Sequence, residues 1–339
     1  MDFGPTDEQR ALVSSLAELL EAQSTPDVVR RAEDTGIDVA LWDSLREFGI
    51  VAMAVPEGSG GWGAGLLDLC LVAEQLGAAL APAPVIEAQV VARLLSRIAG
   101  EVATEALSRV LDAGALVTLA LRPAESDRAS LVPAGAIADE LIVLRDDRLA
   151  LVPLDDDHRQ RIANLASAPL ADVVLRAGSE LCEGMAATSA FGSAIDEWLV
   201  LTAAQLVGSA EAAHRMTCQY ANERQTWGRP IGTHQAVSHP LADSATAIDG
   251  ARLLVRKAAW VADVGDPRAA EVAAMAFGFA AETSKNASYL AVHLHGGVGF
   301  TLEHDAQLHY RRARGWARVW GTSQDAYLRV ADHRYARSA

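Results

Sequence analysis

The chain has 339 residues, of which half are hydrophobic and 5% aromatic, and its 44 acidic and 29 basic residues give a net charge of −15. This length allows two or three domains with substantial cores. The acidic balance argues against general binding to nucleic acid or to anionic membranes, because both need a basic face. Frequent alanine and sparse aromatic residues favour a mainly helical protein.

The three cysteines, Cys70, Cys182 and Cys218, are scattered without a Cys-x-x-Cys pair. The sequence therefore indicates neither a metal site nor a disulfide framework. No basic segment followed by an apolar stretch stands at the beginning, and no apolar run is long enough to span a bilayer. We expect a cytoplasmic protein with reduced, unreactive thiols.

Residues 1–113 are predicted to be helical. Apolar residues recur with helical spacing, and start and stop signals place helices at about 5–20, 38–48, 66–80 and 86–111. The glycine-rich segment 58–63 is not followed by Gly-Lys-Ser/Thr and lies outside any βαβ pattern, so we interpret it as a turn rather than a phosphate-binding loop.

Residues 114–188 change to short apolar or β-branched runs, at 116–121, 140–144, 148–152 and 172–175. Arg145-Asp146-Asp147 is predicted to connect two of them as a hairpin. Residues 189–339 return to helix, at about 194–222, 233–264, 267–294 and after Gly321. The chain is thus predicted to be mainly α with a small β domain, divided as 1–113, 114–188 and 189–339.

The most informative stretch is Tyr220–Asp243, YANERQTWGRPIGTHQAVSHPLAD. Its Trp-Gly-Arg-Pro segment must end the preceding helix, and a second helix restarts near Thr233. The resulting corner presents Arg224, Trp227 and Gln235. On composition alone such residues more often cap a helix or pack, but an arginine beside an aromatic ring on a tight turn also suits the pyrophosphate and rings of a dinucleotide.

A second stretch, His293–Thr301, places adjacent glycines just beyond a helix end. Such glycines allow positive φ and a close approach of a ligand to the backbone. His293 and His295 are two residues apart on a helix end, so their side chains should diverge. With no third ligand nearby, we predict no metal site.

Three motifs in this sequence resemble flavin-dependent acyl-CoA dehydrogenases. They are Y-A-x-x-R-x-T-[FW]-G-x-P-I-x-x-x-Q-A-V-x-H-x-L-A-D from Tyr220, H-x-H-G-G-x-G-F-T-x-E-H-D from His293, and W-x-x-L-x-x-x-G-[IL]-x-x-x-x-V-P-E-x-x-G-G-x-G from Trp42. The resemblance covers essentially the whole chain. It implies an N-terminal helical domain, a middle β domain and a C-terminal four-helix bundle. It also implies a reaction in which a Glu removes the α-proton of an acyl-CoA while FAD takes the β-hydrogen as hydride.

The sequence departs from the family pattern where the catalytic Glu is expected. Of the two positions used in the family, one holds Trp320 and the other Trp198, and indole cannot accept an α-proton. The arginine that the family places near coenzyme A falls at Leu199. The flavin-contacting run of the middle domain has only a remnant at 121–127. We therefore expect no catalytic residue in this chain.

The retained motifs are the ones that a neighbouring subunit contributes to each flavin in the family's tetramers. The resemblance makes five residues candidates for contact with FAD held mainly by a partner: Arg224, Trp227, Gln235, His293 and Gly297. At the position of His293 the family usually has Gln. This combination resembles the non-catalytic subunits of α2β2 acyl-CoA dehydrogenases from bacterial steroid side-chain degradation. It implies a homologous Glu-bearing partner through which the acyl-CoA mainly binds, with electron-transferring flavoprotein as acceptor.

Two alternatives stay open. The chain could be an active homo-oligomeric dehydrogenase with a relocated acid at Glu197, Glu303 or Asp305. However, Glu197 is offset by about 100° around its helix from the family position, and the other two more simply begin and cap the next helix. The chain could also be a helical scaffold without flavin, or a module that binds an acyl thioester. The acyl group stays open among steroid-derived, branched and medium-chain types.

Overall fold

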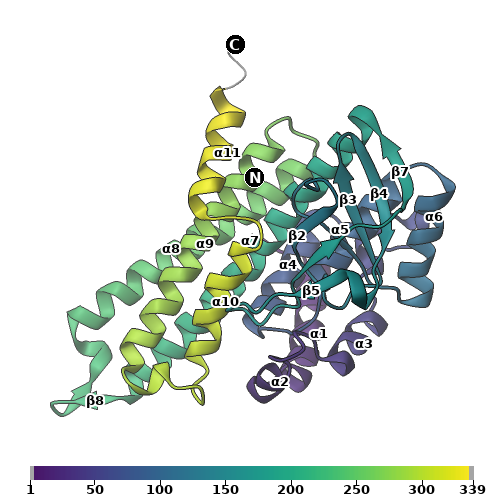
Figure 1. The fold of residues 1–339 in the computed structure, drawn as a ribbon. Helices are drawn as coiled ribbons and strands as arrows, with labels where there is room; N and C mark the ends of the chain where they lie inside the picture. Colours follow the sequence, from purple (N-terminus) through teal and green to yellow (C-terminus); the bar gives the residue numbers. More distant parts are fainter. Residues whose placement is uncertain (1–3, 336–339) are drawn as a thin grey trace. The chain divides into compact units, whose positions relative to one another are not determined.

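A computed structural model describes residues 4–335, and the chain divides into two compact units. The bundle unit comprises Met1–Val29, Cys70–Ala81 and Leu199–Ala339, and the sheet unit comprises Arg30–Leu69 and Pro82–Trp198. The divisions fall within helices α4 (Leu66–Ala78) and α7 (Gly184–Glu223) as well as within α2 (Pro26–Arg31). Helices predominate, and most strands lie in the sheet unit, so the predicted fold class is confirmed (Figure 1).

Local signals explain where the first helices begin. Helix α1 (Asp7–Gln23) starts at a capping box, in which Thr6 and Gln9 each bond the other's main-chain N–H. Helix α3 (Val39–Glu47) starts at Asp38, whose side chain accepts a hydrogen bond from the Leu41 N–H. Both starts agree with the sequence prediction.

The helical stretch predicted for 86–111 is interrupted once in the structure. The chain forms α5 (Val85–Arg97) and α6 (Glu101–Ser108), separated at Gly100, which adopts a φ of 138° that other residues rarely tolerate. A π-helical turn (Arg109–Ala113) follows α6 and ends at Gly114, also at positive φ. The interruption lets α5 pack against the first strand and α6 against the last.

The strands form two small sheets in the sheet unit. They are β1 (Val117–Leu119), β2 (Arg128–Val132), β3 (Glu140–Arg145), β4 (Arg148–Pro153), β5 (Arg159–Arg161), β6 (Ala171–Val174) and β7 (Ser179–Glu183). Their orders are β1-β3-β4-β7 and β2-β6-β5, and only the β1–β3 pair is parallel. Arg145 lies opposite Arg148, so the predicted hairpin is confirmed, with Asp146 at a φ of 54° in its two-residue turn.

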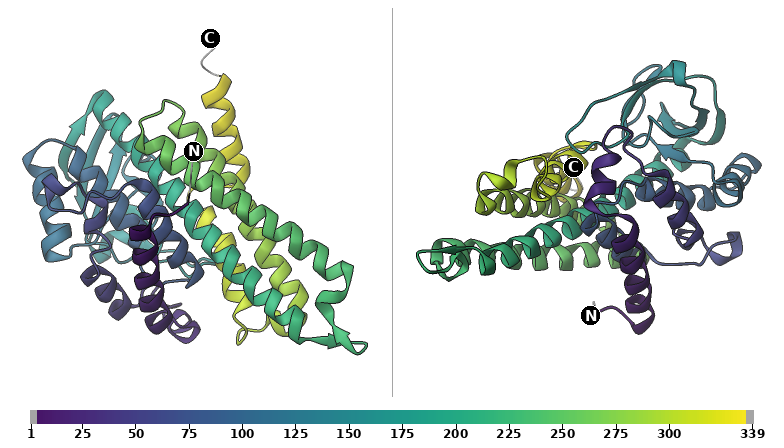
Figure 2. Two further views of the ribbon diagram at one scale, coloured as in Figure 1. Left: turned by 180° about the vertical axis from the view of Figure 1, so that it is seen from behind. Right: turned by 90° about the horizontal axis from the view of Figure 1, so that it is seen from below.

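In the bundle unit, α9 (Ala269–His295) packs against α8 (Gln235–Asp263), α10 (Ala306–Arg318) and α11 (Ser323–Tyr335). Figure 2 shows α7 and α8 running side by side to a hairpin at one end of these helices. Helix α7 begins at Gly184, well before the predicted start near Ala194. The segment 184–193 lacks an apolar period, but its alanines favour helix.

Two glycines bring α4 and α7 into backbone contact. A Cβ atom on Gly208 would lie 1.8 Å from the Glu74 carbonyl oxygen, and one on Gly77 would lie 1.9 Å from the Gln205 carbonyl oxygen. No side chain fits at either position, so these two helices can cross at this distance only with glycine.

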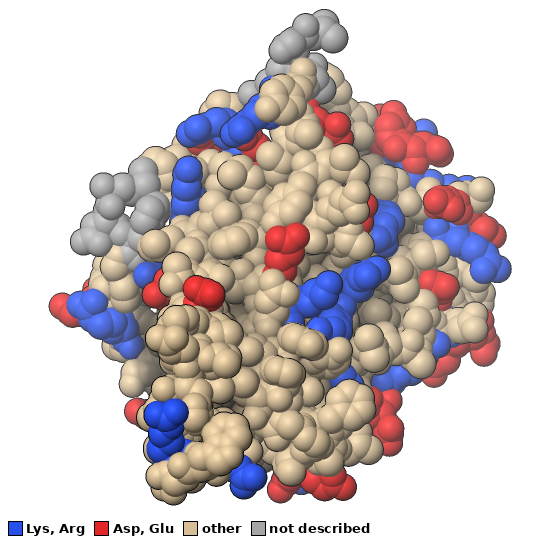
Figure 3. Space-filling model, turned by 90° about the vertical axis from the view of Figure 1, so that its left-hand side faces the viewer, with Lys and Arg blue, Asp and Glu red and all other residues tan. Residues whose placement is uncertain are grey.

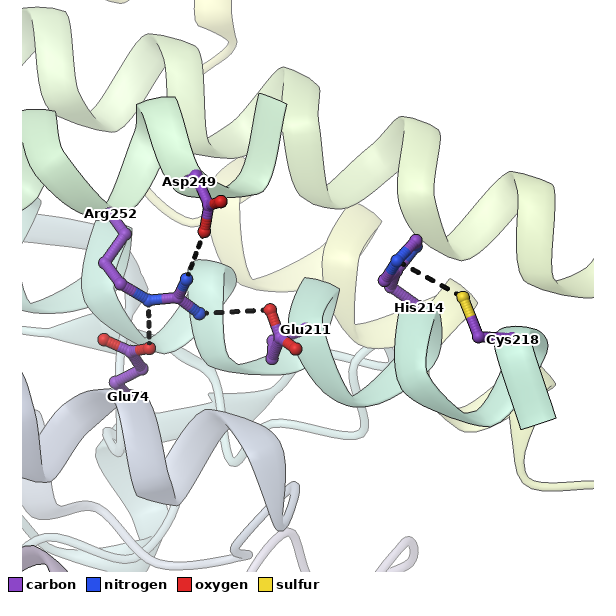
Figure 4. Close-up of polar contacts among 6 residues, drawn as sticks. All are labelled: Glu74, Glu211, His214, Cys218, Asp249 and Arg252. Carbon is purple, nitrogen blue, oxygen red and sulfur yellow. Dashed lines mark hydrogen bonds and ion pairs between the residues drawn. The ribbon is translucent and has the colours of Figure 1, made fainter. Parts of the chain in front are cut away.

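The same crossing carries an ion network (Figure 4). Arg252 of α8 donates from Nε to Glu74 of α4 at 2.7 Å, from Nη2 to Glu211 of α7 at 3.1 Å, and from Nη1 to Asp249 at 2.9 Å. One guanidinium therefore links three helices. Nearby on α7, Cys218 Sγ lies 3.4 Å from His214 Nε2, and burial raises the pKa of the thiol, which stays protonated at neutral pH.

We predict that Gly208→Ala lowers the free energy of unfolding by about 2–4 kcal/mol, because the added methyl group forces α4 and α7 apart. Gly192→Ala on the same helix α7 is the matched control. Beyond the neighbouring backbone of the helix itself, no atom of the described residues lies within 4 Å of a Cβ there, and alanine should stabilise the helix by about 0.5–1 kcal/mol. Urea denaturation of both variants measures the difference, and equal effects would contradict the backbone contact.

We also predict a pH-dependent loss of stability from His309. Its ring is 4% exposed, its Nδ1 lies 2.9 Å from Ser209 Oγ, and burial, together with Arg312 and Arg215, lowers its pKa to about 3. The folded pKa lies below the unfolded value of 6.5, so this stabilisation is complete above pH 6.5 and declines as pH falls toward 3. Between pH 6.5 and 5 the loss should be about 2 kcal/mol. His309→Gln should show a correspondingly flatter profile in urea denaturation, and parallel profiles would contradict this assignment.

Candidate functional site

The corner after α7 is a small hairpin. Strand β8 (Gln225–Thr226) pairs with β9 (Arg229–Pro230), and Trp227 and Gly228 form the turn with φ values of 52° and 76°. Two positive φ values are what a tight two-residue hairpin turn requires, and they are unfavourable for a bulky side chain. A 3-10 turn (Ile231–Thr233) follows and α8 begins at Gln235. The predicted loop is therefore an ordered turn that presents tryptophan at its tip.

The predicted corner residues all face solvent. Trp227 is 87% exposed, and its ring meets that of His234 edge to face, with 5.6 Å between the ring centroids. Arg224 is exposed, and among residues 4–335 its guanidinium makes no hydrogen bond or ion pair. Gln235 is exposed in the first turn of α8. A guanidinium without a protein partner beside an exposed indole retains its full capacity to bind an anion and a planar ring.

The end of α9 joins this corner through a buried histidine. His295 is 5% exposed, stacks on Tyr220 of α7 at 4.3 Å, and donates from Nδ1 to the Ala291 carbonyl oxygen at 2.7 Å. His293 instead is exposed, and its ring lies parallel to that of Tyr289 with 6.0 Å between the ring centroids. The two histidines diverge as predicted. The structure thus brings the ends of α7 and α9 together, and with them the two motifs.

The glycines after α9 fall into two kinds. A Cβ atom on Gly299 would lie 2.7 Å from His295 Cβ, and Gly296 has a φ of 65°, so the fold itself needs both. Gly297 has an ordinary φ of −57°, and apart from its two chain neighbours no described residue has an atom within 4 Å of where its Cβ would be. The fold does not require glycine at 297, but a ligand or a partner approaching the backbone would.

Large apolar side chains are exposed around these two segments. They are Trp227 at 87%, Phe300 at 73%, Leu302 at 72%, Val298 at 62% and Tyr289 at 56%. Figure 3 views the molecule from the side of the hairpin and shows a broad area with few charged side chains in its lower half. Exposed apolar groups gathered in this way are typical of a surface that another molecule covers.

Trp320, predicted to occupy one family acid position, is a packed residue between α10 and α11. Its ring is half-buried and meets Phe277 edge to face at 5.4 Å, and the Arg329 guanidinium lies 5.9 Å from its centroid. The Trp320 indole therefore packs near both an aromatic ring and a cation.

Trp198, predicted to occupy the other position, is 3% exposed and donates from Nε1 to Glu87 Oε1 at 3.2 Å. Burial raises the pKa of Glu87, although hydrogen bonds from its own main chain and from Trp198 act in the opposite direction. The sequence analysis missed Glu87. The available signal was an acid inside Val85–Ala92, a helical segment that is otherwise almost entirely apolar on all sides.

Glu197, one of the predicted alternative acids, is fixed in a buried ion pair. Its Oε2 accepts from Arg93 Nε at 3.1 Å and its Oε1 from Arg97 Nη1 at 2.7 Å, and its side chain is 9% exposed. Both oxygens are therefore already committed to cations of α5.

The other two alternative acids lie at the start of α10. Glu303 is exposed, and Asp305 occupies the N-cap position. The side-chain acceptor for the first helical N–H, that of Ala306, is His304 Nδ1 at 3.1 Å. The predicted helix start is observed here, with the histidine as capping residue.

The remnant at 121–127 forms a tight turn in the sheet unit. The main chains of Glu125 and Arg128 bond each other, and Ser126 between them has a φ of 59°. Within residues 4–335, no three His, Cys, Asp or Glu side chains are grouped as metal ligands. The described helices also include none with the length and apolar character that crossing a membrane requires.

Comparison with known proteins identifies similar domains over most of the chain. Residues 191–333 match the acyl-CoA dehydrogenase C-terminal domain, and residues 6–111 match the acyl-CoA dehydrogenase N-terminal domain. The acyl-CoA dehydrogenase IpdE2 of Mycobacterium tuberculosis is 31% identical over 338 residues, which cover 96% of this chain and 97% of the relative.

Two solved structures are similar over nearly the full length. The ChsE4-ChsE5 complex from Mycobacterium tuberculosis gives a TM-score of 0.89 at 25% identity, with 100% of both chains covered. The Tcur3481-Tcur3483 steroid ACAD gives a TM-score of 0.90 at 25% identity, with 98% of this chain and 99% of that chain covered. Both structures contain two different polypeptides by name.

We predict that Glu197→Gln lowers the free energy of unfolding by about 3–5 kcal/mol, because the buried Arg93 would lose its counter-ion and the partly exposed Arg97 would lose the same partner. Glu105→Gln on α6, where the carboxylate is exposed, is the control and should change stability by less than about 0.5 kcal/mol. Urea denaturation compares them. A stable Glu197→Gln variant would return this residue to the candidate bases.

Proposed function

Since the chain belongs to the acyl-CoA dehydrogenase family, we propose that it is a non-catalytic subunit of an FAD-dependent enzyme of this family. Its partner is a homologous chain that carries the catalytic Glu, and the two form an α2β2 complex. When bound, FAD accepts the β-hydrogen of the acyl-CoA as hydride. The contribution of this chain is to complete the flavin site of its partner.

The observation that carries the proposal is the pair of tryptophans at the two positions where the family pattern expects an acid. Neither indole can remove a proton, and both rings are packed, Trp198 against Glu87 and Trp320 against Phe277. Of the alternative acids, Glu197 binds two arginines and Asp305 lies at a helix start, so neither offers a substitute. Proton abstraction therefore falls to the partner.

The exposed corner supports the flavin-completing role. The Arg224 guanidinium would pair with the pyrophosphate, and the Trp227 ring would stack on a planar ring. Gln235 and His293 would supply hydrogen bonds, and the open backbone at Gly297 would admit close contact. All five residues are exposed in the single chain, as a site shared with a second subunit requires.

The exposed apolar side chains of the same surface support a partner of the same fold. Related proteins of known structure pair two different chains, and one of them is named as a steroid ACAD. We extend to this chain both the pairing with a second, different chain and the steroid-derived acyl-CoA as substrate. The acyl-CoA would bind mainly through the partner, and electron-transferring flavoprotein would be the electron acceptor.

The test is the amount of FAD per chain, measured by absorbance after gel filtration. The chain purified alone should hold little FAD and dehydrogenate no thioester, and co-expression with the correct homologous Glu-bearing chain should restore both. Stoichiometric FAD with turnover by the chain alone would instead support an active homo-oligomer. A colourless protein in every combination would support a scaffold or thioester-binding module.

We predict that Arg224→Ala weakens FAD retention by the complex about 10- to 100-fold, because it removes a charged hydrogen bond to phosphate. Lys257→Ala, at an exposed cation of α8, is the matched control and should retain FAD normally. Titration of the apo-complex with FAD measures both dissociation constants. Equal values would remove Arg224 from the flavin site.

A further inference from the structure

The β3–β4 hairpin carries two arginines directly opposite each other. Arg145 and Arg148 flank its two-residue turn and are cross-strand partners. Such partners project from the same face of a hairpin, with their Cβ atoms about 4.5–5.5 Å apart, and two like charges at this separation are unfavourable. An anion bound between the two guanidinium groups would remove that repulsion.

A recess of about 500 Å³ lies beside this pair. It opens between the hairpin and the segment 175–178, which runs from β6 of one sheet to β7 of the other. Figure 1 shows β3, β4 and β7 side by side in the first of these sheets. Both arginines of the pair line the recess, and so do Ala150 and Leu175, which are half-buried and supply apolar surface that solvent reaches. Room for a small molecule thus adjoins both cations and apolar side chains.

No protein carboxylate holds either guanidinium group of the pair at short range. Arg145 is exposed and, among residues 4–335, makes no hydrogen bond or ion pair. Arg148 Nε lies 3.7 Å from Glu180 Oε2 and 3.8 Å from Glu183 Oε2. These distances exceed the roughly 2.7–2.9 Å of a charged hydrogen bond. The pair therefore retains N–H donors for an anion.

The remaining charged groups of the recess do not take these donors. Asp146 and Asp147 form the turn itself, are exposed, and make no ion pair within the described part of the chain. Because both lie in solvent, water and salt weaken their effect on a bound anion. The third arginine, Arg176, is already paired with Asp155, whose Oδ2 lies 2.6 Å from its Nη1.

We propose that this recess binds a small organic anion. Its carboxylate or phosphate group lies between Arg145 and Arg148, and its apolar body packs on Ala150 and Leu175. Guanidinium groups suit both kinds of anion, because their N–H donors match pairs of oxygen atoms. The recess shares no residue with the proposed flavin contacts, so the chain alone should bind this ligand, without FAD and without a partner.

Three probes with the same ring test the recess: cyclohexanecarboxylate, cyclohexyl phosphate and the uncharged cyclohexanecarboxamide. Ligand-observed NMR titration of the full chain should show at least one anion binding about tenfold more tightly than the carboxamide, the usual effect of a charged hydrogen bond. The tighter anion identifies the charged group of the ligand. Arg145→Gln should abolish the preference for the anion, and Ala150→Phe should weaken binding of all three probes because its ring enters the recess.

Arg161→Gln, at an exposed arginine of β5 that does not line the recess, is the matched control and should keep the preference. Equal binding of the anions and the carboxamide by the wild-type chain would overturn the site. Equal losses in Arg145→Gln and Arg161→Gln would also overturn it, because the preference would then reflect general surface charge. If Ala150→Phe does not fold, the exposed Arg145→Gln still decides.

Coenzyme A separates this site from the proposed function. If it does not displace the bound anion, the recess is a separate site, as proposed. Displacement by coenzyme A would overturn the inference, because the recess would then belong to the thioester. The amount of FAD per chain, which tests the proposed function, affects neither outcome.

Discussion

The stacking of His295 on Tyr220 is the contact on which the candidate site depends. The two rings lie 4.3 Å apart, at the ends of α9 and α7, in segments that are far apart in the sequence. Because His295 also donates to the Ala291 carbonyl oxygen, its ring cannot turn away without leaving a buried polar atom unpaired. This fixes the hairpin with Arg224 beside the glycine turn with Gly297, while the groups that would meet a ligand remain outside the contact.

Around Trp198 the chain shows how burial gives different properties to two neighbouring acids. Glu197 faces Arg93 and Arg97, so its charge is neutralised inside the protein. Glu87 meets an uncharged donor, and burial raises its pKa. Substitution of the expected acid by tryptophan therefore goes together with a carboxyl group of a different character on α5.

Much of the fold could be predicted from the sequence, because helix caps, apolar periods and hairpin signals act locally. Asp38, the Asp146 turn and the end of α7 at the hairpin illustrate this. The break at Gly100 was missed because the apolar period continues across it, and the early start of α7 was missed because alanine carries little periodicity. Glu87 could not be assigned, since its partner Trp198 lies 111 positions away and only the fold brings them together. The corner residues were found through a motif, and their roles toward FAD stay predictions.

At Gly297, what the fold requires of a residue can be distinguished from what a binding surface requires of it. Its backbone angles are ordinary and the space beside it is open among the described residues, so nothing in the isolated fold selects against a side chain there. Any requirement for glycine at this position must therefore come from a molecule outside the single chain. We therefore expect variation at 297 to be silent in a folding assay and to matter only where another molecule approaches this backbone.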